Sequence, residues 1–308
     1  MAASGAGLAV LLLEGALRIA GARYDLAPTV QFGWPDPATL QSRYVQDPDL
    51  FWVTKDYGEK LDAARRARPQ IVFLGDSCTE FGTYPRQTVE HLATRGAVGL
   101  TGVALASGGW SSEQGVAQLE RDVIPLHPRV VVIYFGWNDH WIALGPSDPD
   151  LRLAHQFLRL TEYSRVAQMA LKARIGLLAR TAEMRLRVPP ERYLLNLERM
   201  VRLSREASIA AVIVTAPSNH IPGHEPDYLA PRHLRRLADL VPLHQQYVEL
   251  TRRAARETQA TLCDAAAEFA AFGASRDAYF LADGIHFTEA GDEQLAGIVS
   301  RCIFAALR

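Results

Sequence analysis

A serine near one end of the chain and an acid–histidine pair near the other could together form a nucleophile and its base. The serine is Ser77, in the string Gly-Asp-Ser, and the pair is Asp283 and His286, in the string Asp-Gly-Ile-His. A serine hydroxyl is a weak nucleophile at neutral pH and needs an adjacent base that a third group orients. Two residues between Asp283 and His286 allow one turn to place the carboxylate against the imidazole. Asp283 would then fix the tautomer, and His286 would take the Ser77 proton.

The residues before Ser77 predict how it is positioned. Residues 71–74 form a continuous apolar run of strand length that breaks into a glycine turn, which is typical of a buried parallel strand leading into a helix. Ser77 would then lie at the carboxyl edge of a sheet, where α/β proteins bind ligands, beside the N–H groups of a helix N-terminus. Since Glu80 follows three residues later, the alternative is that Ser77 merely caps this helix.

Two further strings follow predicted strands. Residues 130–135 are apolar and lead to Gly136-Trp137-Asn138-Asp139, and residues 103–106 lead to a turn that contains Gly109 and two consecutive serines. Taken alone, Asn138 and Gly109 could simply be turn formers.

The four strings, in this order, resemble those of the SGNH (GDSL) hydrolases. The resemblance implies that Ser77, Asp283 and His286 are catalytic, and that an oxyanion hole is formed by the Ser77 and Gly109 backbone N–H groups and the Asn138 amide. Two positions depart from the family pattern: Ala104 stands where Asn is frequent, and Cys78 where Leu is common. Cys78 is a rival nucleophile, but adjacent residues on a turn point in different directions, and the family pattern selects Ser77.

Aromatic residues cluster in the sequence around the expected oxyanion residues. An aromatic rim can stack on sugars or contact an acyl chain. We therefore expect a substrate-binding rim built from Trp110, Trp137, His140 and Trp141.

The pattern of apolar runs predicts the fold class. Strands are expected near residues 71–75, 98–105, 130–135, 209–215 and 260–264, with helical stretches between them. Such alternation predicts parallel βαβ units in a three-layer α/β/α sandwich. The resemblance implies a flavodoxin-like sheet of about five strands within residues 65–308. One segment is longer than a minimal crossover and mostly helix-forming, so we expect a helical insertion at about 141–195.

Residues 1–24 contain an apolar, helix-like stretch, and residues 25–64 are interpreted as a connector. The stretch is shorter than the ~20 uncharged residues of a membrane span and lacks a basic region before it. Three interpretations remain open: the distal end of a signal anchor, an interfacial helix, or an amphipathic helix packed on the domain. We favour the anchor, and with it an extracytoplasmic location on the cytoplasmic membrane; a cytoplasmic location is the alternative.

The amino-acid composition restricts the partners and cofactors that we expect. The 308 residues are 48% hydrophobic with a net charge of −1, which suits one sizeable core and gives no basic field for nucleic acid. The three cysteines, Cys78, Cys263 and Cys302, suggest neither a disulfide framework nor a zinc site. The nine histidines contain no HExxH pattern, so we expect no metal and no cofactor.

Residues 151–187 form a basic segment with eight basic and two acidic residues, a net charge of +6. One interpretation is a solvated helix pair beside the sheet. The other is a cap that meets an anionic membrane or an acidic polysaccharide.

The expected function is that of a serine ester hydrolase with an acyl-serine intermediate, acting on a small-molecule or glycan ester. A carbohydrate O-acetyl esterase or similar short-chain esterase is favoured. The alternatives are an acyltransferase of the type that O-acetylates bacterial exopolysaccharides, a lipase or thioesterase, and a non-catalytic glycan-binding protein.

Overall fold

The computed structural model of the 308-residue chain describes residues 2–23, 35, 37–143, 147–156, 163–181, 185–230 and 233–308. Its centre is a five-stranded parallel sheet with the order β4-β3-β5-β8-β9. The order is that of a flavodoxin-like sheet, so the predicted fold class is confirmed. The strands are β3 (Ile71–Gly75), β4 (Gly102–Ala106), β5 (Val130–Tyr134), β8 (Ala210–Val214) and β9 (Thr261–Cys263).

The predicted strand positions agree with these bounds except at the start of β4. That strand was expected from residue 98, but Gly96 and Gly99 both have positive φ and turn the chain before Gly102. Glycine adopts this conformation without the steric cost that other residues meet, so the turn delays the strand.

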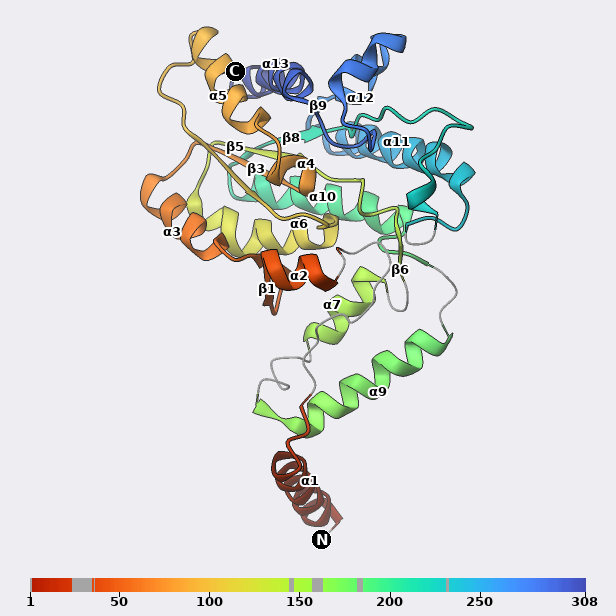
Figure 1. The fold of residues 1–308 in the computed structure, drawn as a ribbon. Helices are drawn as coiled ribbons and strands as arrows, with labels where there is room; N and C mark the ends of the chain where they lie inside the picture. The colour runs from red at the N-terminus through yellow and green to blue at the C-terminus, as the bar shows by residue number, and fades with distance from the viewer. Residues whose placement is uncertain are drawn as a thin grey trace.

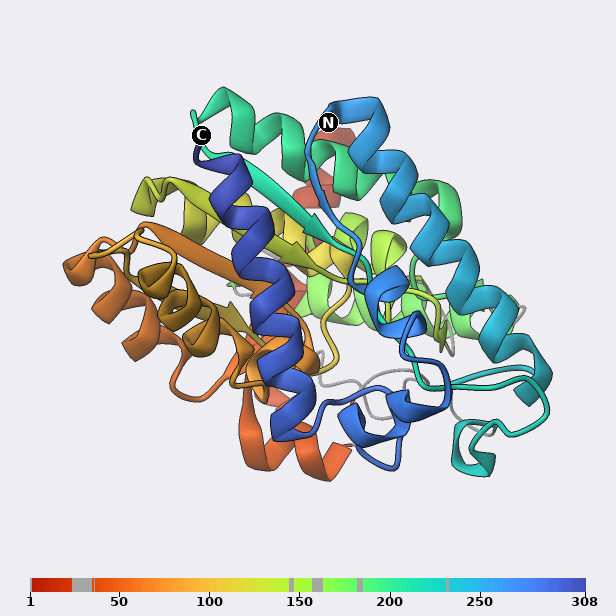
Figure 2. The ribbon, with the colours of Figure 1, turned by 90° about the horizontal axis from the view of Figure 1, so that it is seen from above.

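Helices cover both faces of the sheet, which explains why β3 and β5 are continuous apolar runs (Figures 1 and 2). Ile71 and Phe73 belong to the core on one side and Val72 and Leu74 to the core on the other, because successive side chains of a strand alternate between faces. One layer contains α5 (Tyr84–Thr94), α12 (Ala265–Ala270) and α13 (Glu289–Ala306), and the other contains α3 (Tyr57–Ala67), α6 (Ser112–Gln118), α10 (Pro190–Glu206) and α11 (Leu240–Thr258).

The segment expected to be a connector is part of the folded body from residue 37 onward. It forms α2 (Pro37–Arg43) and an antiparallel hairpin of β1 (Tyr44–Asp47) and β2 (Phe51–Thr54). Every residue of β2 is buried. The Asp47 carboxylate accepts the N–H groups of Asp49 and Leu50 and closes the turn. Burial of the hairpin against the sheet layer, which no local pattern signals, is why the connector interpretation was wrong here.

The expected insertion follows β5 and begins and ends in a short antiparallel pair, β6 (Ile142–Ala143) with β7 (Arg185–Leu186). Between these strands lie α7 (Asp148–Gln156) and α9 (Arg165–Thr181). Figure 1 shows α9 outside the layered body, next to the N-terminal helix α1 (Ala2–Ile19). The Glu14 carboxylate of α1 accepts the N–H groups of Arg165 and Val166 at the start of α9, at 3.0 Å each, and these bonds lower the pKa of Glu14 to about 2.

Two arginines of the basic segment are directed inward and do not form part of a charged surface. Arg152 pairs with the buried carboxylate of Glu113, and Arg187 pairs with Asp148 with neither side chain exposed. These two arginines therefore contribute little to a charged surface, because each guanidinium is neutralised by a buried carboxylate. The anionic-surface interpretation of the segment stays a prediction. Arg159, Glu162 and Glu183, and the side chains of Arg174 and Arg180, lie outside what the structure describes.

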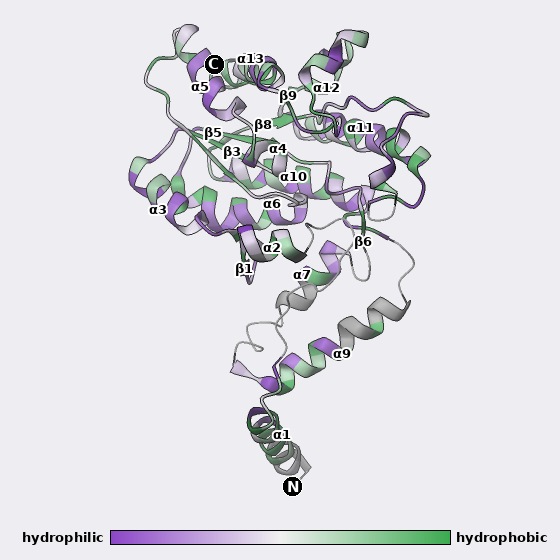
Figure 3. Ribbon diagram, in the orientation of Figure 1, coloured by the Kyte–Doolittle hydropathy of each residue, from purple (hydrophilic) through white to green (hydrophobic). Residues whose placement is uncertain are grey.

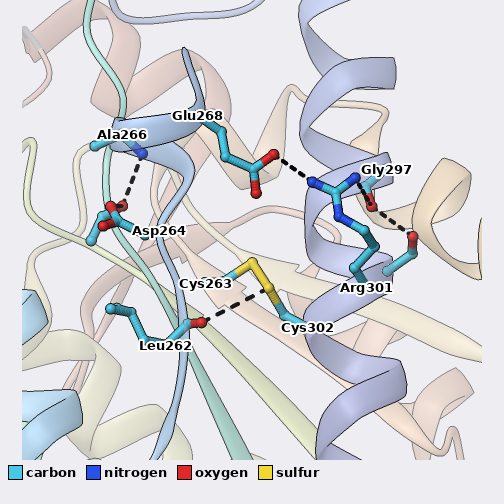
Figure 4. Close-up of a disulfide and its surroundings, with 10 residues drawn as sticks. Leu262, Cys263, Asp264, Ala266, Glu268, Gly297, Arg301 and Cys302 are labelled. Carbon is cyan, nitrogen blue, oxygen red and sulfur yellow. Dashed lines mark hydrogen bonds and ion pairs between the residues drawn. A yellow bond between two sulfur atoms is a disulfide. The ribbon is translucent and has the colours of Figure 1, made fainter. Parts of the chain in front are cut away.

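A disulfide joins β9 to α13, contrary to the expectation that the cysteines form no such link (Figure 4). Cys263 and Cys302 have Cα atoms 5.7 Å apart, within the usual range for a disulfide. Their separation of 39 residues follows no motif, and only the packing of α13 along the sheet brings them together. Cys78 is the remaining cysteine and is a buried thiol.

The smaller elements connect these layers. They are α4 (Ser77–Glu80), a π-helical turn at Leu119–Val123, and 3₁₀ turns at Ile124–Leu126, Asp227–Leu229, Leu237–Asp239 and Gly273–Tyr279.

Candidate active site

Ser77 is placed by a tight turn between β3 and the short helix α4. A Cβ atom on Gly75 would lie 2.1 Å from Thr79 Oγ1, so only glycine lets the helix start this close to the strand. The N-cap is Asp76, whose carboxylate accepts the Cys78 N–H at 3.0 Å. Ser77 is therefore the first helical residue and not the cap. Glu80 does not complete a capping box either, because its carboxylate accepts the Tyr44 hydroxyl and the Gly108 N–H.

The C-terminal loop brings the acid and the histidine to Ser77. His286 Nε2 lies 2.8 Å from Ser77 Oγ, and His286 Nδ1 lies 2.6 Å from Asp283 Oδ2. The other oxygen, Asp283 Oδ1, accepts the N–H groups of Ile285 and His286 at 2.9 Å each. Asp283 is thus fixed by its own turn, and it directs the imidazole toward the serine.

Asn138 lies in the loop that follows β5, at the same edge of the sheet. Its Nδ2 donates to Asp76 Oδ2 at 3.1 Å, and the side chain is 8% exposed. Since an amide nitrogen carries two hydrogens, Asp76 orients the group and leaves a second N–H for another acceptor.

Gly109 lies in the loop after β4 and has φ of +77°. A Cβ atom there would lie 2.6 Å from Pro35, so both the conformation and the space require glycine. The Gly108 carbonyl accepts the indole N–H of Trp52 at 2.9 Å. Because C=O and N–H point in opposite directions across a trans peptide, the Gly109 N–H is directed away from Trp52.

The sequence that carries this geometry matches a known family. Residues 73–294 match the GDSL-like Lipase/Acylhydrolase family. The chain belongs to this family. Its members hydrolyse ester bonds, so the protein is an ester hydrolase.

Several solved structures are similar to the chain in fold. A lipase/acylhydrolase from Enterococcus faecalis is 18% identical with a TM-score of 0.52, covering 77% of this chain and 96% of its own. A GDSL-like lipase from Bacteroides thetaiotaomicron is 17% identical with a TM-score of 0.48, covering 81% and 98%. An acetylxylan esterase from Geobacillus stearothermophilus is 19% identical with a TM-score of 0.47, covering 77% and 93%. No curated protein matches the chain significantly.

The aromatic residues expected to form a substrate rim of this GDSL hydrolase are buried. Trp110 is 0% exposed, and its indole N–H donates to the Trp52 carbonyl in the core below the sheet. Trp137 stacks on His244 with ring centroids 3.9 Å apart, and His140 Nε2 lies 3.1 Å from His244 Nδ1. Trp141 is 3% exposed. The expectation of an open rim is therefore wrong for these four residues, because they fill the interior beside the loops.

Several residues that support the site carry no sequence signal. His220 Nε2 donates to the Asp283 carbonyl at 2.8 Å, and Trp52 and Glu80 bond to the Gly108 peptide. Arg187 donates to the Gly109 carbonyl at 2.7 Å. All four come from segments distant from the residues they contact, so no local motif could have identified them.

The charges around His286 predict the pH dependence of this GDSL hydrolase. Burial lowers the pKa of His286, but the hydrogen bond and charge of Asp283 outweigh it, and the net pKa is raised above 6.5. A general base must be neutral, so kcat/KM should rise with pH and reach half of its plateau above 6.5. Burial also raises the pKa of Asp76 to about 6. Protonation of Asp76 would weaken its hydrogen bond to Asn138, so kcat/KM should fall further as the pH is lowered.

The check is a pH profile of kcat/KM for wild type and Asp283→Asn. Removal of the carboxylate charge should move the half-maximal point to lower pH, while the plateau falls because the tautomer is no longer fixed. If the half-maximal pH of kcat/KM is the same in Asp283→Asn as in wild type, the loss of activity at low pH belongs to a group other than His286.

Proposed function

We propose that the chain is a serine esterase that removes short acyl groups, O-acetyl groups of carbohydrates above all, through an acyl-Ser77 intermediate. The observation that carries the proposal is the chain of contacts from Ser77 Oγ to His286 Nε2 at 2.8 Å and from His286 Nδ1 to Asp283 at 2.6 Å. This is the arrangement that a serine needs to become a nucleophile.

The steps follow from the geometry. Ser77 Oγ attacks the ester carbonyl while His286 Nε2 takes its proton. The Asn138 amide and the N–H groups of Ser77 and Gly109 stabilise the oxyanion. His286 then protonates the departing alcohol, which leaves the acyl group on Ser77. A water molecule, deprotonated by His286, attacks this ester, and collapse returns the acid and free Ser77.

The burial of Trp137 and Trp141 supports a short acyl group. Trp137 packs against the buried His244 and Trp141 against the buried His140, so neither side chain lines an open channel. A long acyl chain needs apolar surface along its length to gain binding energy, and these two indoles do not provide it.

The test is a panel of p-nitrophenyl esters from acetyl to palmitoyl, together with acetylated sugars, with Ser77→Ala as the blank. We expect kcat/KM to be highest for acetyl groups and to fall with chain length. A rate that rises toward palmitoyl would instead indicate a lipase. Acyl-enzyme breakdown that needs an added glycan would indicate an acyltransferase.

We also propose that the protein acts outside the cytoplasm, attached to a membrane by α1. None of the described helices is both long enough and apolar enough to cross a membrane. However, α1 lies at the end of the molecule, away from the layered body (Figure 3). Six of its large apolar side chains are at least half exposed: Leu8, Val10, Leu11, Leu12, Leu13 and Ile19. Its charged residues Glu14 and Arg18 pair with each other at 2.7 Å. The Cys263–Cys302 disulfide supports an oxidising compartment.

Membrane attachment is tested by co-sedimentation with neutral vesicles. The exposed fractions of Leu11 and Leu12 are 70% and 68%, and burial of a leucine side chain contributes about 2 kcal/mol. Leu11→Ser with Leu12→Ser should therefore reduce binding at least about tenfold.

A matched control is Val98→Ser with Leu195→Ser, which removes two exposed apolar side chains from the body and should leave binding unchanged. Equal binding by both double variants would contradict a role for α1. Binding that needs anionic lipid and disappears in salt would assign attachment to the basic segment at 151–187.

A further inference from the structure

Arg187, at the exit of the insertion, is a fully buried arginine that bonds to the loop carrying Gly109. Its Nε and Nη2 lie 3.1 and 2.8 Å from Asp148 Oδ2, and its Nη1 donates to the Gly109 carbonyl at 2.7 Å. Arg187 and Asp148 are each 0% exposed. A charge that is buried so completely must be well paired, so the guanidinium has a defined position.

Asp148 extends the same network to the next turn of the loop. Its Oδ2 accepts the Ser111 hydroxyl at 2.7 Å, and its N–H donates to the Arg187 carbonyl at 2.8 Å. The Arg187 N–H in turn donates to the Trp141 carbonyl at 2.7 Å. The two ends of the insertion are therefore joined to each other and to the loop at Gly109 and Ser111.

Gly109 needs such support because glycine adopts many backbone conformations at little cost. The peptide that precedes Gly109 is held through the Gly108 carbonyl by Trp52, and the Gly108 N–H donates to the Glu80 carboxylate. The peptide that follows Gly109 is held through its carbonyl by Arg187. Fixing the peptides on both sides of Gly109 fixes its φ and ψ, and with them the direction of its N–H.

We propose that Arg187 is a positioning residue of the oxyanion hole: it holds the Gly109 N–H in place from the helical insertion. This inference rests on the proposed function, in which Gly109 donates to the oxyanion. Arg187 acts through the backbone and contacts no substrate. The insertion is then a structural part of the catalytic machinery and not only an appendage beside it.

The decisive variant is Arg187→Lys. A lysine keeps the charge, but it lacks the planar fork that reaches Asp148 and Gly109 together. A displaced catalytic group can cost up to about 10²-fold in rate, so we expect kcat on a short-chain ester to fall about 10- to 100-fold with KM within about twofold. The rate of fluorophosphonate labelling should fall in parallel, because the phosphonyl oxygen occupies the same hole.

The matched control is Arg152→Lys. Arg152 also lies in the insertion and pairs with a buried carboxylate, Glu113, but it has no bond to Gly109. It should keep the wild-type kcat. A folded Arg187→Lys protein with wild-type kcat, or an equal fall in both variants, would overturn the proposal.

Asp148→Asn keeps the test decisive where Arg187→Lys does not fold. The asparagine retains an acceptor for Arg187 but removes the charge that fixes the guanidinium, so a smaller fall in kcat with unchanged KM supports the proposal. Wild-type kcat in Asp148→Asn overturns it. Ser77→Ala separates the proposed function from the proposed role of Arg187. If Ser77→Ala retains activity, the proposed function itself is refuted. If Ser77→Ala is inactive while Arg187→Lys keeps the wild-type kcat, only the role of Arg187 is refuted.

Discussion

Replacement of Ser77 by alanine is expected to lower kcat by about 10⁴- to 10⁶-fold, which is the cost of removing the nucleophile of a serine hydrolase. The substitution deletes the attacking oxygen, 2.8 Å from His286 Nε2. Because Ser77 is not the N-cap of α4, the fold should survive with a loss of about 1 kcal/mol or less. Steady-state kinetics and thermal unfolding of the two proteins measure both effects.

The neighbouring thiol provides the matched control. Cys78 is 1% exposed, and burial raises the pKa of its thiol well above the ordinary value, so it is neither accessible nor ionised. Cys78→Ala should keep activity within a few-fold and retain fluorophosphonate labelling at Ser77. Labelling on Cys78, or hydrolysis that persists in Ser77→Ala, would contradict the assignment of the nucleophile.

Asn138→Ala is expected to lower kcat by about 10²- to 10³-fold with little change in KM. An oxyanion donor acts mainly in the transition state, so its loss does not weaken binding of the ester. The Asn138 amide is oriented for this by Asp76 Oδ2 at 3.1 Å. Single-turnover and steady-state kinetics separate the two parameters.

The alanine variant also leaves Asp76 without its amide donor, at a cost of about 1–3 kcal/mol. Unfolding measurements must therefore show that the protein remains folded at the assay temperature. Asn219→Ala is a suitable control. The Asn219 Nδ2 also donates to a carboxylate, that of Asp277, but this hydrogen bond is exposed and does not involve Asp76. A rise in KM with unchanged kcat would make Asn138 a ground-state binding residue.

The amino-acid sequence by itself determined the sheet and the order of the blocks that carry the chemistry. The apolar runs that end at Gly75 and Tyr134 are buried on both faces, and such strands are readable because both faces must be apolar. The Asp283–His286 contact was also accessible, since it forms within one turn. Local patterns report local structure and burial, and these features depend on little else.

Only the tertiary structure decided what surrounds and supports these residues. The aromatic residues Trp110 and Trp137 proved to be buried, and Arg187 proved to be a buried partner of Asp148. The Cys263–Cys302 disulfide depends on the path of α13 along the sheet. Charge and aromatic character in a sequence do not state which way a side chain points, because that depends on packing between segments far apart in the chain. The support of the Gly109 peptide by Trp52, Glu80 and Arg187 arises in the same way, from three segments that meet only when the chain is folded.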